Sequence, residues 1–336
     1  MGKRILCILL AVLLSGVLCL GCTAQTQPYT VTYLDLFDTV TTILGTNGSE
    51  EDFQREARQI HDKLLQYHRL FDIYNEYENL SNLKTVNDQA GVAPVTVDPA
   101  LIELLKDCKT YYELTDGKVN VAMGSVLGLW HEARQADVAK LPAEKELAEA
   151  AAHTDIACLR IDENASTVYL TDPVMSLDVG AVAKGWAVQK VAQTAPKGML
   201  ISAGGNVYAT GAKDQDGTPW VVGVQHPVNS SENICKLSVT HGAVVTSGDY
   251  QRTYRVDGKD YHHIIDPATR MPSRYWRSVT VVAEDSALAD ALSTALFLLP
   301  LEEGKALAKA CDAQVLWVDE QTKTHMTDGF QHLLYD

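Results

Sequence analysis

The sequence predicts an α+β protein in which mixed or antiparallel sheets are packed against helices. From about residue 157 onward, short strand-like runs follow one another, and the predicted helices of this region, at about 181–195 and 286–299, stand apart from them. Asp257 and Gly258 separate two of the runs and are typical of a two-residue hairpin turn. Because strands and helices do not alternate regularly, the pattern does not favour a parallel βαβ fold.

The region before residue 157 is predicted to begin with paired strands and to continue with helices. Alternating residues at 29–45 predict the strands, and the segment 51–71 predicts a helix. A second helix begins with Asp98 as its N-cap and Pro99 in its first turn. The polar, alanine-rich segment 141–153 predicts a third helix. The apolar stripe of the first helix is formed by Phe53, Ala57, Ile60, Leu64 and Phe71.

The composition is that of a globular protein with a large core. Of the 336 residues, 46% are hydrophobic and 21% are charged. The length suggests about two domains, or one elaborate domain. The formal net charge is −15. A nucleic-acid surface needs a basic stripe to meet the phosphates, so this composition argues against nucleic-acid binding.

The N-terminus has the pattern of an export signal. Lys3 and Arg4 precede a long apolar run, and Gly21 and Cys22 follow it. A small residue directly before a cysteine resembles a bacterial lipoprotein cleavage site, although Cys19 stands where leucine is usual. The alternative is a plain transmembrane anchor, but the run is shorter than the roughly 20 residues that a spanning helix prefers.

These features divide the chain into three segments. Residues 1–21 are predicted to be a lipoprotein signal peptide, residues 22–30 a short linker that begins at the lipidated Cys22, and residues 31–336 one folded domain. We expect the mature chain to be lipid-anchored to the cell membrane and to face the extracytoplasmic side. Without CxxC spacing, four further cysteines are predicted to be buried free thiols: Cys108, Cys158, Cys235 and Cys311.

Two glycine-containing stretches are candidates for ligand binding. Asp178 and Gly180 precede the helix predicted at about 181–195, and Lys184 lies in its first turns. Either Asp178 caps the helix and Lys184 is solvated, or the helix N-terminus faces an anion to which Lys184 adds charge. The turn at 204–206, with the sequence GGN, is either an ordinary hairpin turn or a place where backbone approaches a ligand closely.

Helical spacing places Asp290 and Thr294 one turn apart on the helix predicted at 286–299. A carboxylate and a hydroxyl in this arrangement can ligate one hard cation such as Mg²⁺, which takes oxygen ligands. The alternative is that the Thr294 hydroxyl bonds back to the carbonyl of Ala291 or Asp290. The spacing alone does not decide between these two interpretations.

Two adjacent histidines stand in the segment 260–272, which reads DYHHIIDPATRMP. Neighbouring residues of a strand point to opposite faces, so His262 and His263 cannot both face one cavity. One of them is therefore expected to be functional and the other structural.

Together these stretches resemble the ApbE family of FAD:protein FMN transferases. The family pattern is found here, in order and spacing, as LDVGAVAKG, GGN, TSGDYQR, HHIIDPAT and ADALST, between residues 178 and 294. Weaker matches at 37–40, 71–74 and 115–121 extend the resemblance over nearly the whole mature chain. The resemblance implies a T-fold-like flavin transferase architecture, with residues 31–336 as the catalytic domain.

The resemblance assigns a metal site and a residue for the chemistry. It implies that Mg²⁺ is held by the side chains of Asp290 and Thr294 and by the backbone carbonyl of Ala181, with Ser293 close to them. It also implies that His263 carries out the chemistry. His262 is then the neighbour that points away.

The resemblance further assigns the binding of FAD, which is the substrate. Tyr74 matches the aromatic position that packs on the isoalloxazine ring. The other positions implied to contact FAD are Phe37, Lys118, Val119, Asn120, Asp178, Lys184 and the backbone near Ile264. Three residues depart from the family pattern: Arg270 replaces a turn glycine, Asn120 replaces a carboxylate, and Phe37 stands where methionine is frequent.

The implied reaction is Mg²⁺-dependent transfer of FMN from FAD to a Thr or Ser hydroxyl of an acceptor flavoprotein, with release of AMP. His263 would act as the general base. The acceptor is expected to be a subunit of a membrane redox pump or another exported flavoprotein. Two alternatives stay open: an FAD pyrophosphatase, in which water replaces the acceptor hydroxyl, and a non-catalytic, lipid-anchored flavin-binding protein.

Overall fold

The computed structural model describes residues 27–46, 48–250 and 252–335. The predicted signal peptide and the predicted lipidation residue Cys22 lie outside these residues. Among the described residues, no helix has the length and apolar character needed to span a membrane.

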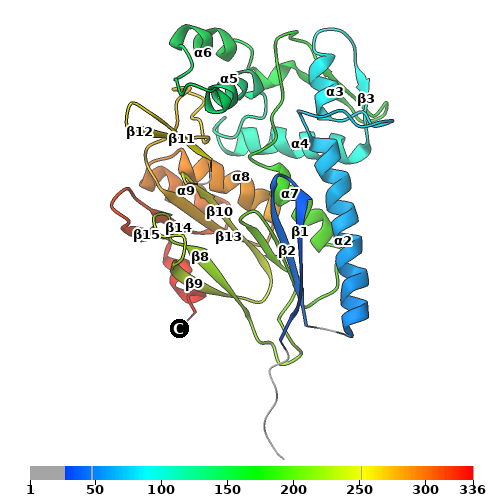
Figure 1. Ribbon diagram of the computed structural model, residues 1–336, viewed down its shortest axis with the longest axis vertical. Coiled ribbons are helices and arrows are strands. Elements are labelled where there is room, and N and C mark those ends of the chain that lie inside the picture. The colour runs from blue at the N-terminus through cyan, green and yellow to red at the C-terminus, as the bar shows by residue number, and fades with distance from the viewer. Residues whose placement is uncertain (1–26, 47, 251, 336) are drawn as a thin grey trace, which may run out of the picture.

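An eight-stranded sheet forms the centre of the molecule (Figure 1). All neighbouring strands in it run antiparallel, and the described strands form open sheets without a closed barrel. The α+β class with antiparallel sheets is therefore confirmed. In spatial order the strands are β1 (Tyr29–Leu36), β2 (Thr39–Gly45), β6 (Met199–Ala203), β7 (Asn206–Ala209), β10 (Gly242–Gly248), β13 (Ser278–Ala283), β14 (Gln314–Val318) and β15 (Thr324–Met326).

Four helices cover one face of this sheet. They are α2 (Glu50–Phe71), α7 (Ala183–Ala192), α8 (Ser286–Phe297) and α9 (Leu301–Ala310). Helix α2 packs on β1 and α7, while α8 packs on α7, β10 and β13. The predicted apolar stripe of α2 is confirmed because all five of its members are buried. Ser49 and Asp52 form a capping box that fixes where α2 begins.

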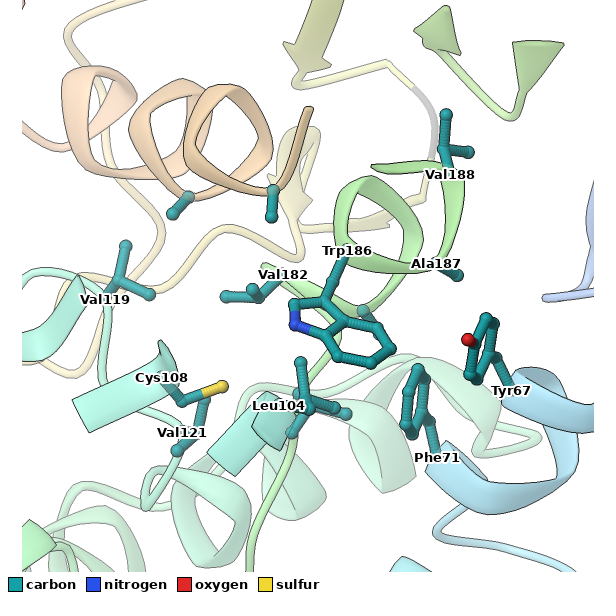
Figure 2. Close-up of a cluster of buried hydrophobic side chains, with 14 of the residues drawn as sticks. Tyr67, Phe71, Leu104, Cys108, Val119, Val121, Val182, Trp186, Ala187 and Val188 are labelled. Atoms are coloured by element: carbon teal, nitrogen blue, oxygen red, sulfur yellow. The ribbon is translucent and has the colours of Figure 1, made fainter. Parts of the chain in front are cut away.

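The largest core packs these helices against the sheet and continues between α2, α7 and α4 (Pro99–Leu114), where Figure 2 shows it. The indole ring of Trp186 meets the rings of Tyr67 and Phe71 edge-on, with centroids 5.3 and 5.6 Å away. Its Nε1 donates to Asp107 Oδ2 at 2.8 Å, so this large buried ring leaves no polar group unsatisfied. The core thereby holds α7 in a fixed position under the candidate site.

A mostly helical lobe stands above the sheet in Figure 1. Helix α4 has Asp98 as its N-cap and Pro99 in its first turn, as the sequence predicts. Helix α5 was not predicted, because Gly124 and Gly128 weaken the helical pattern. The elements of the lobe are α3 (Leu83–Asp88), β3 (Val95–Thr96), α4 (Pro99–Leu114), α5 (Gly124–Gln135), α6 (Glu144–Ala151), η1 (Ile156–Cys158), β4 (Leu159–Asp162) and β5 (Thr167–Leu170).

Two hairpins complete the fold. The strands β8 (Trp220–Gln225) and β9 (Asn233–Val239), together with η2 (Asp328–Leu333), pack on the face of the main sheet opposite to α8. The strands β11 (Thr253–Val256) and β12 (Lys259–His262) pack on α5. Asp257 and Gly258 join β11 and β12 with φ values of 48° and 76°, which confirms the predicted hairpin turn.

The four cysteines of the folded domain are all free, as predicted. Only Cys108 is fully buried, and burial raises the pKa of its thiol. Cys158, Cys235 and Cys311 are partly exposed, so the expectation that all four are buried is wrong for these three.

Candidate active site

A cavity of about 1010 Å³ lies between the helical lobe and the edge of the sheet at which β1, β6 and β10 end. Ligand pockets commonly measure about 300–1,000 Å³, so this one has room for a large ligand. Ser293 is the one described residue of the predicted site that does not reach the cavity wall. The predicted residues in the wall are Phe37, Tyr74, Lys118, Val119, Asn120, Asp178, Ala181, Lys184, His263, Ile264, Asp290 and Thr294.

Helices α7 and α8 approach each other most closely at a glycine. A Cβ atom on Gly185 would lie 2.3 Å from the Ser286 carbonyl oxygen and 2.4 Å from the Asp290 Cβ. Its absence lets the Gly185 amide donate to Asp290 Oδ2 at 2.7 Å. Burial raises the pKa of Asp290, while the Lys184 cation and the hydrogen bonds from Gly185 and Asn206 act in the opposite direction.

The same contact frees a backbone carbonyl at the start of α7. In a regular helix the amide of residue 185 would bond to the carbonyl of residue 181. Here the Gly185 amide bonds to Asp290, and no hydrogen bond within the described part of the chain reaches the Ala181 carbonyl. Since Ala181 lines the cavity, its oxygen is available to a ligand there.

Thr294 also presents an unused oxygen to the cavity. Its hydroxyl forms no hydrogen bond with residues 27–46, 48–250 or 252–335. The back-bond considered for Thr294 is made instead by Ser293, whose Oγ donates to the Asp290 carbonyl at 2.8 Å. The Ser293 Oγ also lies 2.8 Å from the Ser247 Oγ, so Ser293 links α8 to β10 behind the cavity wall.

The turn before α7 differs from an Asp-capped helix start. Helix α7 begins at Ala183 with Val182 as its N-cap, so Asp178 is not the capping residue. Asp178 Oδ1 instead accepts from the Gly180 amide at 2.8 Å. Lys184 Nζ lies 3.5 Å from the Gly180 carbonyl and has no carboxylate partner among the described side chains. The cavity therefore has an ammonium group that forms no ion pair within the described part of the chain.

The two histidines have different surroundings. The His262 ring is held between the Ser273 carbonyl, 2.6 Å from its Nε2, and the Ile264 amide, which donates to its Nδ1 at 3.2 Å. The same ring packs edge-on against Phe297 of α8. Only His263 lies at the cavity, which agrees with the expectation from strand alternation.

His263 is neutral in this environment. Burial lowers its pKa to about 3, and the positive charges of Arg252, His262, Lys184 and Arg134 act in the same direction. Its Nδ1 is buried without a hydrogen-bond partner among the described residues, so Nε2 is the ring nitrogen that remains accessible. A neutral imidazole at the cavity wall can accept a proton from a bound hydroxyl.

Two arginines that were not singled out in the sequence complete a cationic wall. Arg134 of α5 and Arg252, which precedes β11, both line the cavity, and no described carboxylate pairs with either. Burial lowers the pKa of Arg134, and the charge of Arg252 adds to this. With Lys184 they concentrate positive charge in a chain of net charge −15, which favours an anionic ligand. Arg252 stands within TSGDYQR, whereas Arg134 belongs to the helix that was not predicted.

Tyr74 forms an aromatic wall of the cavity. Its ring stacks on His131 with centroids 5.1 Å apart and planes 29° apart. Arg134 Nη2 lies 3.1 Å from His131 Nδ1, which therefore serves as an acceptor. This arrangement holds the Tyr74 ring beside the cavity, where it could stack on a planar ligand.

Phe37 also lies in the wall, in a strained conformation. Phe37 and Asp38 connect β1 to β2 with φ values of 52° and 51°, which is uncommon for residues other than glycine. The Phe37 amide donates to His68 Nδ1 at 3.2 Å, and the two rings meet edge-on. Such strained positions concentrate at functional sites.

Asn120 has a structural role in this chain. Its Nδ2 donates to the Thr154 carbonyl and its Oδ1 accepts from the Ala122 amide, both at 2.9 Å. A carboxylate at this position could not donate to Thr154. The side chain of the preceding Val119 is buried in the core (Figure 2), so it has little surface left for a ligand.

The turn after β12 accommodates the departure at Arg270. Arg270 has a φ of 61°, the left-handed conformation that a glycine adopts freely, and its carbonyl accepts from Trp130 Nε1 at 2.9 Å. Lys118 forms an ion pair with Asp266 in the same turn, at 3.2 Å. Ile264 uses its amide for His262 and its carbonyl for Ser273. Arg270 thus takes up the left-handed conformation of the turn in place of a glycine.

Comparison with known proteins identifies the family. The model of the ApbE family matches residues 28–317. The chain belongs to the ApbE family. An FAD:protein FMN transferase of Treponema pallidum (strain Nichols) is 33% identical over 295 residues, which cover 80% of this chain and 81% of the relative. Another, from Klebsiella pneumoniae (strain 342), is 32% identical over 276 residues, which cover 77% of this chain and 83% of the relative.

Solved ApbE structures share the architecture. The crystal structure of the ApbE protein from Thermotoga maritima covers 92% of this chain and 100% of its own, with a TM-score of 0.84 and 29% identity. The flavin transferase ApbE from Vibrio cholerae covers 91% of this chain and 100% of its own, with a TM-score of 0.77 and 25% identity. The predicted flavin transferase architecture of mixed helices and antiparallel sheets is thereby confirmed.

The glycine contact between α7 and α8 gives a prediction for this ApbE chain. Gly185→Ala should lower the free energy of unfolding by about 1–3 kcal/mol, the usual range for overpacking, because the added methyl group forces the helices apart. Gly128→Ala is the matched control, since a Cβ there meets no atom within 4 Å and α5 gains helix propensity. Denaturant unfolding of both variants tests this. Equal stability of Gly185→Ala and the wild type would contradict the close contact.

Proposed function

We propose that this chain transfers FMN from FAD to a Ser or Thr hydroxyl of an acceptor flavoprotein and releases AMP. The observation that carries the proposal is one cavity that holds the Asp290 carboxylate, the unbonded oxygens of Thr294 and Ala181, a neutral His263 and a wall of cations. The ApbE family membership and the FAD:protein FMN transferases among the relatives support it.

The oxygens of Asp290, Thr294 and Ala181 fit a magnesium ion. All three are hard ligands, and Asp290 supplies the one carboxylate. Among the described residues no three His, Cys, Asp or Glu side chains gather into a metal-binding cluster, so a cation here depends on neutral oxygens and on the substrate for its remaining ligands. When bound, Mg²⁺ would neutralise charge on the phosphate oxygens of FAD.

The residues of the chain supply binding and proton transfer. Lys184, Arg134 and Arg252 attract the two negative charges of the FAD diphosphate. His263 Nε2 accepts the proton of the acceptor hydroxyl, while the oxygen of that hydroxyl attacks the phosphorus of the FMN half. The new bond joins this oxygen to phosphorus, the bond from that phosphorus to the bridging oxygen breaks, and AMP leaves with the bridging oxygen.

The reaction is tested by incubating the mature protein with FAD and Mg²⁺, with and without an exported flavoprotein that carries a candidate hydroxyl. We expect AMP and a covalently flavin-labelled acceptor band. AMP with free FMN, unchanged by the acceptor, would identify an FAD pyrophosphatase instead. FAD that binds but stays intact would identify a flavin-binding protein and contradict the transfer.

The chain is also proposed to be lipid-anchored through Cys22 to the outer face of the cell membrane, where an exported acceptor is accessible. The export signal and the Gly21–Cys22 pair support this location. Cys22→Ser should leave an unprocessed precursor without lipid, as shown by its size and by the lack of labelled fatty acid in cells. Normal processing of the variant would contradict lipidation at Cys22.

A further inference from the structure

The β8–β9 hairpin has one open edge. The outer edge of β9 is closed by the C-terminal segment, because the Tyr335 amide donates to the Lys236 carbonyl at 2.8 Å and Leu334 bridges to Leu237. Strand β8, by contrast, pairs with no described strand other than β9. We call the opposite side of β8 the open β8 edge.

The register shows which backbone groups lie on the open β8 edge. Opposed residues of an antiparallel pair either exchange two hydrogen bonds or direct their backbone groups outward, in alternation. Lys236 opposes Gly223, and its carbonyl is bonded to Tyr335 on the side away from β8. Gly223 therefore directs its own N–H and C=O to the open edge, and Val221, two residues earlier, does the same.

The open β8 edge borders the cavity of the candidate active site. Val222, Gly223 and Gln225 line the same cavity as Asp290 and His263. The cavity continues between these two regions past the turn at 204–205 and past Val207, Val244 and Thr246, which also line it. Gly204 and Gly205 present only backbone to this passage, and the Thr39 side chain packs on Gly204, where a Cβ would lie 2.4 Å from the Thr39 Oγ1.

The sheet surface next to the open β8 edge is uncovered. Neighbouring strands of the main sheet pair in register at Thr42, Ser202, Val207 and Val244, so these four side chains share one face of the sheet. The β8–β9 hairpin covers this face at Val244. At the start of β2, however, that face stays open, because Val40, two residues before Thr42, is 53% exposed. An extended chain could lie over these strands against the open edge.

We propose that the acceptor polypeptide docks on the open β8 edge as an added strand and passes its hydroxyl-bearing residue over the turn at 204–205 into the cavity. The inference rests on the proposed transfer reaction, which requires a polypeptide to reach a site that also holds FAD. Continuity between the edge and the cavity supports this occupant. Strand addition would bind the acceptor through main-chain hydrogen bonds.

Gly223→Pro tests the docking. Proline removes the N–H that points to the open edge and makes no demand on the β8–β9 hydrogen bonds, which edge strands tolerate. Its Cβ would lie 2.7 Å from Asn233 Nδ2, so the exposed Asn233 side chain must move aside. With an acceptor that the wild type labels, we expect KM for the acceptor to rise about tenfold or more, because one main-chain bond is lost and its partner is left unpaired. The Kd for FAD and the kcat should stay within about twofold of the wild type. Lys236→Ala is the control, since it changes only an exposed side chain of β9, away from the open edge and the cavity, and it should label normally.

Hydrogen exchange on the wild type gives a second test that needs no variant. The amides of Val221 and Gly223 should exchange quickly in the free protein and become protected when the acceptor is added. Unchanged exchange there, or wild-type acceptor kinetics in Gly223→Pro, would overturn the docking site alone. Weaker FAD binding by Gly223→Pro would assign the edge to the AMP half of FAD and also overturn it. Failure of the wild type to label any acceptor would overturn the proposed function together with this inference.

Discussion

Asp290→Asn should abolish Mg²⁺-dependent transfer, so that the rate falls by more than about 100-fold. This exceeds the loss expected for a residue that only orients a metal ligand. Asp290 is the one carboxylate among the oxygens predicted to hold the ion, and asparagine takes away its charge while keeping its size. The asparagine Oδ1 can still accept from the Gly185 amide, which is 2.7 Å from the carboxylate in the wild type. Initial rates of AMP release at several Mg²⁺ concentrations measure the effect.

A binding measurement separates this role from a structural one. Burial raises the pKa of Asp290, which means that the charged form is costly without a cation. Asp290→Asn removes that cost, so the melting temperature without Mg²⁺ should be unchanged or higher. In the wild type, Mg²⁺ with FAD should raise the melting temperature, and in the variant this increase should be absent.

Asp107→Asn provides the control for a half-buried carboxylate outside the cavity. Burial raises the pKa of Asp107 as well, and its Oδ2 accepts from Trp186 Nε1 at 2.8 Å. Asparagine keeps an acceptor there, so activity should stay close to that of the wild type. If Asp107→Asn lost as much activity as Asp290→Asn, or if Asp290→Asn kept normal turnover, the metal assignment would be wrong.

The parts of the fold that the sequence predicted correctly depend on local rules. The stripe of α2, the Asp98 cap of α4 and the turn at 257–258 each follow from residues within one or two turns of one another. Helix α5 has no such signal, because its glycines lower its propensity. Gly124 is nevertheless required, since a Cβ there would lie 2.4 Å from the Ser176 carbonyl oxygen. Tertiary packing, which the sequence pattern does not contain, determines this helix.

In the candidate site, too, local spacing predicted some features and only the tertiary fold determines others. The spacing of Asp290 and Thr294 indicated their common face, but the free Ala181 carbonyl depends on a contact between residues 105 positions apart. The cationic wall likewise brings together Arg134, Lys184 and Arg252 from three separate elements. Ser293 has the same hydroxyl chemistry as Thr294, and only the structure shows that it faces β10.

His263→Ala should slow the transfer by about 10²- to 10⁴-fold, the usual contribution of a general base. The affinity for FAD should be largely kept, because the cations and the aromatic wall remain. The measurement is single-turnover transfer of FMN to an acceptor at saturating FAD and Mg²⁺. His263→Gln should not restore the rate, since an amide cannot take up the proton.

His262→Ala is the matched control, and its defect should be in stability. Its ring bonds to the Ser273 carbonyl and the Ile264 amide and packs on Phe297. Leaving these backbone groups unsatisfied costs about 1–3 kcal/mol for each. We therefore expect a lower midpoint of denaturant unfolding, together with a much smaller loss of single-turnover rate than in His263→Ala.

The pH dependence follows from the environment of His263. Its pKa of about 3 lies below the ordinary 6.5, because burial and then the charge of Arg252 disfavour the imidazolium ion. The imidazole is therefore the neutral, proton-accepting form throughout pH 5–8, and kcat/KM, which reports the free enzyme, should show no fall near pH 6.5 from this residue. Bound FAD brings the charges of its diphosphate, which offset the cations, so any acid limb of kcat should lie at higher pH than that of kcat/KM. A fall of kcat/KM near pH 6.5 that disappears in His263→Ala would show that the imidazole is not held neutral. Equal rate losses in the two histidine variants would mean that the turn as a whole, and not the His263 imidazole, is required.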